Sequence, residues 1–169
     1  MNSIELKSLQ APFKEKYRTE PASAMITLKA VGKIGEGISC SVESGRALIE
    51  AGLHPATGGT GLLACSGDLL LEALVACAGV TLRAVATAIG VEIKNGVVKA
   101  EGDLDFRGTL GVSKEIPVGF QSIRLQFNLD SNATAEQIES ISKLTERYCV
   151  VYQTLTKAVR IETQYHLSQ

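Results

Sequence analysis

The sequence predicts an α+β fold, with strands grouped before and between two main helices. Two short segments rich in β-branched residues, 24–32 and 38–44, precede a long apolar helical pattern over 66–89. A strand pattern over 121–130 then precedes a second helical pattern, which begins at a capping-box signature. The chain has 169 residues, enough to bury a core without disulfides or metal ions.

The composition excludes several classes of function. The formal net charge is −1 and the basic residues are scattered, which argues against a nucleic-acid partner. The one local concentration, KEKYR at 14–18, is typical of a solvated N-terminal tail. The first 25 residues lack the apolar stretch of a signal peptide, and Glu72 and Arg83 interrupt the longest apolar run. We therefore expect a cytoplasmic protein without a membrane span.

The first elements follow from local patterns. The segments 24–32 and 38–44 are expected strands, and the glycine-rich stretch 32–37 between them is an expected turn. The segment 46–67 is loop-like because it contains Pro55 and several glycines. A phosphate-binding loop is not favoured there, since the Lys-Ser/Thr ending of such loops is missing.

The long helix has recognisable ends. Ser66 is the expected N-cap, and Asp68 lies in the first turn, where the helix dipole favours a negative charge. The helix should run to about Ile89, with Gly90 just past its end as the C-terminal cap.

The second half begins with strands. Residues 96–111 are expected to form a strand that leads into a glycine-marked turn. Residues 121–130 follow as a strand whose apolar positions share one face, and these positions are Ile123, Leu125, Phe127 and Leu129.

A helix and a closing segment complete the chain. Thr134 and Gln137 form the capping-box signature. Behind it, apolar positions recur at helical spacing, and these are Ile138, Ile141, Leu144 or Thr145, and Tyr148. The last segment, 150–167, suggests a short helical turn and a closing strand.

The cysteines decide which chemistry to consider. The chain has four of them, which are Cys40, Cys65, Cys77 and Cys149. None forms a C-x-x-C pair, and neither His54 nor His166 stands at zinc-ligand spacing from a cysteine. We therefore expect no metal and no cofactor, and structural disulfides are unusual in a reducing compartment. The thiols are then either inert core residues or redox-active groups.

Cys77 lies in the middle of the long helix. The residues on its stripe are mostly small and include no group that ionises a thiol, and these residues are Leu70, Ala73, Leu74, Thr81, Ala84 and Ala88. Burial there favours an inert core thiol. A reactive Cys77 would need a cation from a different element or another chain, and Lys33 and Arg46 are the candidates.

Several motifs together resemble the OsmC/Ohr family of thiol-dependent hydroperoxide reductases. They are HPATGGTG at 54–61, SGDLLLEALVACAGVTL at 66–82, GDLDFRGTLGV at 102–112 with PVGFQSIRLQF at 117–127, and ERYCVVYQTL at 146–155. They occur in the family's order, and the resemblance is closest to the OsmC-like branch. It divides the chain into an N-terminal tail or extension, 1–24, and an OsmC-like domain, 25–169.

The resemblance implies an OsmC-like fold in which antiparallel sheets pack on two central Cys-bearing helices of an intertwined homodimer. It implies that Cys77 is the peroxidatic thiol and Cys149 the resolving thiol. The implied reaction is reduction of a small organic hydroperoxide in oxidative or osmotic stress defence. Cys77 would pass through a sulfenic acid to a disulfide, and a dithiol reductant, of lipoyl or another type, would restore both thiols.

The sequence departs from the family at supporting positions. The family's Glu near the start of the Cys helix falls on Gly67, and Asp68 beside it projects opposite Cys77 on a regular helix. The family's Arg position in the early strands is occupied by Lys33 or by nothing obvious, and Arg46 and Glu72 are further candidate supporting residues. The usual Cys-Pro of the second motif reads Cys149-Val150. Cys65 is an extra thiol and a candidate alternative resolver.

Two rival functions remain. One is a non-catalytic, stress-associated binding protein that keeps the pocket and has lost the thiol chemistry, which the missing Glu favours. The other is a Cys-dependent hydrolase that uses His54, although no acid to orient that histidine is apparent.

Overall fold

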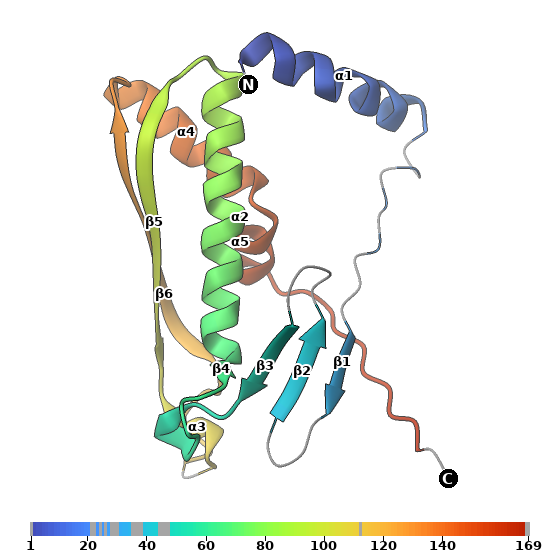
Figure 1. Cartoon of the computed structure of the whole chain (residues 1–169), viewed down its shortest axis with the longest axis vertical. Coiled ribbons are helices and arrows are strands. Elements are labelled where there is room, and N and C mark those ends of the chain that lie inside the picture. Colours follow the sequence, from blue (N-terminus) through green and yellow to red (C-terminus); the bar gives the residue numbers. More distant parts are fainter. Residues whose placement is uncertain are drawn as a thin grey trace.

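The computed structural model describes residues 2–20, 23, 25, 27, 31–34, 39–43, 48–111 and 113–167. It confirms the α+β class (Figure 1). The elements, in chain order, are α1 (Ser3–Thr19), β1 (Val31–Ile34), β2 (Ser39–Glu43), β3 (Leu48–Gly52), a 3-10 helix (Pro55–Thr57), β4 (Ala64–Cys65), α2 (Ser66–Ala88), β5 (Ile93–Leu104), α3 (Phe106–Thr109), β6 (Phe120–Ser131), α4 (Ala135–Tyr148) and α5 (Val150–Thr156).

The N-terminal sheet has the order β1-β2-β3-β4, with antiparallel pairs except for the parallel pair β3–β4. It lies beside the lower part of α2 in Figure 1. The second strand agrees with the prediction, but β1 occupies 31–34, part of which was assigned to the turn. Residues 24, 26 and 28–30 of the expected first strand lie outside the described residues.

The prediction of a loop over 46–67 is wrong. This segment contains the strand β3, the 3-10 helix and the short strand β4. Because Ala51 and Gly52 are small, the sequence pattern does not indicate a strand there. In the structure, β3 pairs along its whole length with β2, and Ile49 lies opposite Val42. Pairing with a neighbouring strand therefore overrides a weak local pattern.

The ends of α2 agree with the prediction only in part. Ser66 is the first helical residue rather than the N-cap, and Cys65 takes the cap position without a side-chain hydrogen bond. At the other end Gly90 has φ +76°, a left-handed conformation that glycine adopts without strain. The Gly90 and Val91 N–H groups bond to the Thr87 and Ala86 carbonyls, the pattern of a Schellman cap.

By length and composition alone, α2 is apolar enough to cross a membrane, and no other helix in the described part of the chain is. The central helix of a folded protein has the same composition, so this is weak evidence for a span. Within one chain only 28% of the most apolar stretch of α2 is buried. Much of this helix is therefore uncovered in a single copy.

The second sheet is a long antiparallel hairpin of β5 and β6, in which Val98 lies opposite Phe127. The predicted face of β6 is confirmed, because Ile123, Leu125, Phe127 and Leu129 are half-buried and alternate with exposed residues. A Cβ at Gly102 would overlap the ring of Phe120, so only glycine allows this ring to pack across the hairpin.

The helix α4 begins at the predicted capping box, with reciprocal bonds between Thr134 and Gln137. Its buried stripe continues at a spacing of four residues through Ile141, Thr145 and Cys149, whereas Tyr148 is 59% exposed. The predicted helical turn after it is α5, but no strand forms in the described residues 157–167. Among the described residues, that segment has no partner strand.

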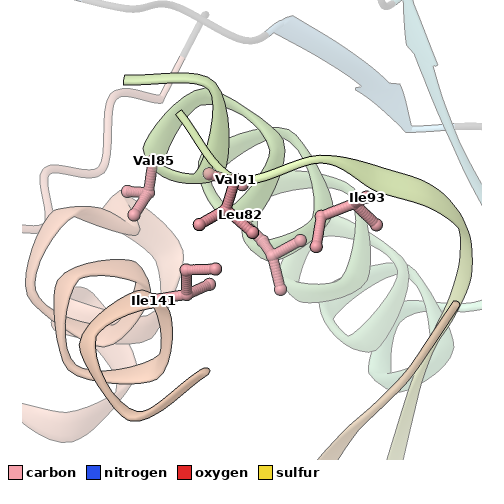
Figure 2. Close-up of a cluster of buried hydrophobic side chains, with 6 residues drawn as sticks. Leu82, Val85, Val91, Ile93 and Ile141 are labelled. Carbon is pink, nitrogen blue, oxygen red and sulfur yellow. The ribbon is translucent and has the colours of Figure 1, made fainter. Parts of the chain in front are cut away.

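The main core lies between α2, α4 and the start of β5, as Figure 2 shows. Ile141 of α4 points toward Leu82 and Val85 of α2, and Val91 and Ile93 close the cluster. This packing holds α4 at a fixed distance from α2, which determines where the chain after α4 meets the middle of α2.

The N-terminal extension is a helix rather than an irregular tail. A capping box between Asn2 and Glu5 begins α1. The basic cluster at 14–18 lies in its exposed C-terminal half, where Arg18 pairs with Glu15. The Ser3 hydroxyl donates to the Ala88 carbonyl at 3.5 Å, so the start of α1 lies beside the C-terminal end of α2, and the rest of α1 runs away from it (Figure 1). The proposed boundary at residue 24 stays a prediction.

Candidate active site

The site is built around Cys77 and Cys149, which the packing of α2 against α4 and α5 brings into contact. Cys77 lies in the middle of α2 and is half-buried, whereas Cys149 is 1% exposed. Both are free thiols. The Cys149 thiol donates a hydrogen bond to the Cys77 sulfur.

The backbone at Cys149 positions the groups around the pair. Cys149 ends α4, with its N–H bonded to the Thr145 carbonyl at 2.9 Å, and it is also the N-cap of α5. Its extended conformation, with φ −72° and ψ 110°, breaks the helix and turns the chain. The first N–H groups of any helix lack a partner within that helix. Here the N–H groups of Val150 and Val151 are free to point at the Cys77 sulfur.

These donors change the acidity of Cys77. Burial by itself raises the pKa of the thiol, because a charge is less stable away from water. The Val151 and Val150 N–H groups and the Cys149 thiol outweigh that effect, because each stabilises the thiolate by hydrogen bonding. The pKa of Cys77 therefore lies below its ordinary value.

The acidity of Cys149 changes in the opposite direction. Burial raises its pKa, and the nearby Cys77 sulfur, which accepts its proton, raises it further. The Tyr152 N–H group opposes this only in part. The pair therefore ionises first at Cys77, and Cys149 remains a thiol that donates to the thiolate.

Thr81 is a weaker contributor to the same site. Its hydroxyl lies within reach of the Cys77 sulfur, but it donates to the Cys77 carbonyl at 2.8 Å. A hydroxyl has one hydrogen, so it serves the sulfur only when it leaves the carbonyl. The backbone N–H groups, which the chain holds in place, are the dependable donors.

Two cavities of similar size lie next to the pair, along β6. One, of about 310 Å³, is lined by Leu74, residues 120–123, Leu125, Tyr152, Leu155 and Thr156. The other, of about 280 Å³, is lined by Ala78, Ile123, Leu125, Phe127, Ser142, Thr145, Glu146, Cys149 and Tyr152. The second reaches Cys149, and neither reaches Cys77. The first has mainly apolar walls, as sites for small organic molecules do, whereas the walls of the second are about equally polar and apolar.

The candidate supporting residues do not gather at Cys77 in the described part of the chain. Asp68 and Glu72 are exposed on α2, and both lie on earlier turns of that helix than Cys77. Lys33 is in β1 opposite Ser41, but its side chain lies outside what the structure describes, and so does the whole of Arg46. The described groups that favour the thiolate are thus neutral hydrogen-bond donors, where the sequence suggested a cation.

Cys65 occupies a different place. It caps the start of α2, twelve residues before Cys77, and a helix rises about 1.5 Å per residue, so some 18 Å separate them. A disulfide needs Cα atoms within about 7 Å. Within one subunit Cys65 therefore cannot resolve a Cys77 sulfenic acid without unwinding three turns of helix.

His54 also lies away from Cys77. It stacks on Phe106 with ring centroids 5.0 Å apart and lines a cavity of about 340 Å³ with Cys65 and Asp68. Its Nδ1 accepts a hydrogen bond from the Ala56 N–H at 3.1 Å. A neutral imidazole that accepts at Nδ1 carries its proton on Nε2 and has no free lone pair for a general base. The geometry does not favour a hydrolase built on this histidine.

Sequence reasoning identified both thiols but missed three groups around them. The Val150 and Val151 N–H groups are backbone groups of residues whose side chains have no polar atom, so no residue pattern indicates them. Thr145, whose hydroxyl is buried, was considered only as a helix-spacing position. The spacing of four residues from Ile141 through Thr145 to Cys149 was a signal that these side chains share one buried face.

Comparison with known proteins gives a consistent family. A family model described as OsmC-like protein matches residues 59–164. An OsmC-like protein from Mycoplasma pneumoniae superposes with a TM-score of 0.64 at 20% identity, over 78% of this chain and 88% of that one. No match is found among curated proteins.

Two further solved structures carry hydroperoxide resistance in their names. One, an organic hydroperoxide resistance protein OsmC from Legionella pneumophila, has a TM-score of 0.61 at 16% identity, over 78% of this chain and 91% of that one. The other, from Elizabethkingia anophelis, has a TM-score of 0.60 at 18% identity, over 77% and 88%. At these identities the similarity concerns the fold.

Proposed function

Because the chain belongs to the OsmC-like protein family, we propose that it is a thiol-dependent peroxidase that reduces organic hydroperoxides at Cys77. The hydroperoxide-resistance proteins among its structural neighbours support a role in stress defence. The observation that carries the proposal is the asymmetry of two touching thiols, in which the pKa of Cys77 is lowered and that of Cys149 is raised.

The reaction follows from this asymmetry. The Cys77 thiolate attacks the outer oxygen of the hydroperoxide, the O–O bond breaks, and the alkoxide takes a proton and leaves as the alcohol. Cys77 is then a sulfenic acid, and the Cys149 sulfur attacks it and expels water to form a disulfide. A dithiol reductant restores both thiols by exchange. Free thiols and a dithiol reductant suit the reducing cytoplasm.

An organic hydroperoxide suits the site better than hydrogen peroxide. The cavity of about 310 Å³ along β6 has mainly apolar walls. An alkyl or aryl group gains free energy when such surfaces remove it from water, at roughly 25 cal/mol per Å² of apolar area.

Mapping of the oxidised thiols tests the proposal. One equivalent of cumene hydroperoxide is expected to give a Cys77–Cys149 disulfide, read by peptide mass spectrometry after the free thiols are blocked. Cys65→Ser is the control and should leave this product unchanged, because its thiol lies three helical turns away. If no disulfide forms, the non-catalytic binding protein becomes the better description, with the cavities along β6 as its ligand site.

We further propose that two copies form the homodimer that the family resemblance implies. The support is the uncovered surface of α2, of whose most apolar stretch only 28% is buried in one chain, with Val80 72% exposed. A contiguous apolar helix surface of this kind is typical of an interface.

The expected mass in light scattering at micromolar concentration is twice that of the 17.9 kDa chain. Val80→Glu should shift the protein toward a monomer, because it places a charge on the uncovered face of α2. Ile161→Glu changes a residue of the C-terminal segment that is 85% exposed and should leave the mass unchanged. A monomer for the unaltered chain contradicts the proposal.

A further inference from the structure

The cavity beside His54 lies at the start of α2, away from the thiol pair. Its volume is about 340 Å³, and its wall contains both the thiol of Cys65 and the imidazole of His54. The other walls come from the first turns of α2 and from the end of the β5–β6 hairpin. Neither Cys77 nor Cys149 lines this cavity, so the proposed peroxidase reaction does not use it.

The sheet topology brings the thiol and the imidazole to one place. The strands β3 and β4 pair in parallel, with Gly52 opposite Cys65, so both strands end at the same edge of the sheet. His54 follows the end of β3 by two residues, and Cys65 is the last residue of β4. In sheets with parallel strands, ligands bind outside the carboxyl ends of those strands. A cavity at this edge is therefore in the position of a ligand site.

The two polar side chains of the wall have different roles. The His54 ring is held by the bond from the Ala56 N–H to Nδ1, at 3.1 Å, and by stacking on Phe106. Its proton is then on Nε2, so His54 can donate a hydrogen bond to a ligand but cannot accept one. Cys65 is a free thiol that makes no side-chain bond to the first turn of α2. The wall thus offers one nucleophile and one hydrogen-bond donor.

The sulfur of Cys65 lies beside apolar surface. A Cβ added at Gly67 would lie 3.6 Å from this sulfur and 3.5 Å from the ring of Phe120, so the sulfur and the ring meet above the first turn of α2. Leu71 and Phe106 are also half-buried in the wall. A hydrocarbon chain that starts near the sulfur gains free energy when these side chains remove it from water.

The charges at the cavity disfavour an anion. Asp68 and Asp103 line it and are exposed. Asp103 already accepts hydrogen bonds from the Ser122 hydroxyl and from Arg124, whereas the carboxylate of Asp68 repels negative charge. In the described part of the chain, no three acidic, histidine or cysteine side chains are grouped to hold a metal ion. The cavity therefore suits an organic molecule without a negative charge.

We propose that this cavity binds α,β-unsaturated aldehydes with an apolar chain and that Cys65 adds to them covalently, with His54 as the donor to the aldehyde oxygen. Each part of such a molecule has a partner in the wall. The chain contacts the apolar side chains, the oxygen accepts from Nε2–H, and the β-carbon meets the sulfur. This activity is separate from the proposed peroxidase function and does not depend on it.

The addition needs no further reactant. The Cys65 thiol gives its proton to water, and an electron pair of the sulfur forms a bond to the β-carbon. The C=C π electrons move toward the carbonyl, and the Nε2–H of His54 stabilises the negative charge that develops on its oxygen. Water then protonates the α-carbon, which leaves a saturated aldehyde bonded to the sulfur. No group leaves, and there is no net oxidation or reduction.

The first test varies the chain of the aldehyde on the unaltered protein. The reduced full chain is treated with excess trans-2-nonenal or trans-2-pentenal, the adducts are fixed with borohydride, and the Cys65 peptide is quantified by mass spectrometry over time. N-acetylcysteine gives the intrinsic reactivity of each aldehyde. Relative to it, nonenal should modify Cys65 about tenfold faster than pentenal, because its longer chain reaches more apolar wall. Equal relative rates overturn the inference, and neither result depends on whether Cys77 reduces hydroperoxides.

The second test removes the donor. His54→Phe keeps a ring that can stack on Phe106, and His54→Asn keeps an acceptor for the Ala56 N–H. Both should slow the addition of nonenal to Cys65 by about 10- to 100-fold. Methyl methanethiosulfonate modifies thiols without forming a carbonyl oxyanion, so its rate at Cys65 should not change. If neither variant slows nonenal more than the thiosulfonate, the donor role is wrong and the inference is overturned.

The third test examines the charge preference. N-ethylmaleimide and 3-maleimidopropionate carry the same reactive ring and differ in a carboxylate, so the uncharged reagent should modify Cys65 faster. Asp68→Asn should narrow this preference by about 2- to 5-fold. The control Asp130→Asn changes an exposed residue at the far end of β6 and should leave the preference unchanged. An Asp68→Asn chain that behaves like this control contradicts the assignment of an uncharged ligand.

Discussion

Cys77→Ser is expected to lower hydroperoxide consumption by at least about a thousandfold, to the background of the buffer. The thiolate is the nucleophile, and a serine hydroxyl in the same position does not ionise near neutral pH. The backbone donors that lower the pKa of Cys77 remain but have no anion to stabilise. The measurement is the loss of cumene hydroperoxide in the presence of dihydrolipoamide.

Cys149→Ser provides the matched comparison, because it removes the other thiol and keeps a hydroxyl that can donate to Cys77. This variant should consume one equivalent of hydroperoxide and then stop, with a sulfenic acid at Cys77 that dimedone labels. Full turnover in Cys149→Ser would show that Cys149 is not the resolving thiol, and full turnover in Cys77→Ser would contradict the peroxidase mechanism.

Val150→Pro is expected to slow the reaction of Cys77 by about tenfold at neutral pH. Proline has no N–H, so the substitution removes one of the two backbone donors that face the sulfur. The pKa of Cys77 then rises, and a smaller fraction of the thiol is ionised at any pH below that pKa. Well above the pKa of both proteins, the rates should converge.

The backbone tolerates this change. Val150 is the first residue of α5, a position where proline is common, and its side chain is 68% exposed. Cys149 already has the extended conformation that a residue before proline requires. Val150→Ala removes nearly the same side chain and keeps the N–H, so it is the control. The pH dependence of iodoacetamide alkylation in the two variants gives the result, and coincident profiles would contradict the assigned role of the Val150 N–H.

The sequence by itself determined the regular elements that have strong local signals. The alternation from Ile123 to Leu129 predicted β6, and the capping box at Thr134 predicted the start of α4. Gly90 predicted the end of α2, because a left-handed C-cap favours glycine. The family motifs singled out Cys77 and Cys149, and the structure brings these two residues together.

Only the tertiary structure decided the elements and the groups that depend on contact. The strand β3 lies in a segment that the sequence assigned to a loop, because it forms by pairing with β2. The end of the chain, which sequence reasoning assigned to a closing strand, has no strand partner within the described residues. The buried hydroxyl of Thr145 and its cavity arise from packing among α2, β6 and α4.

The acidity of Cys77 shows the physical reason most clearly. Sequence reasoning looked for a cation, because charged side chains can be read from residue types. The groups that stabilise the thiolate in the described structure are backbone N–H groups, which every residue except proline carries. They can donate to the Cys77 sulfur because the helix breaks between α4 and α5 at Cys149, and because the core places this break against the middle of α2. The residue types of Val150 and Val151 do not indicate this arrangement, which arises only when the chain is packed.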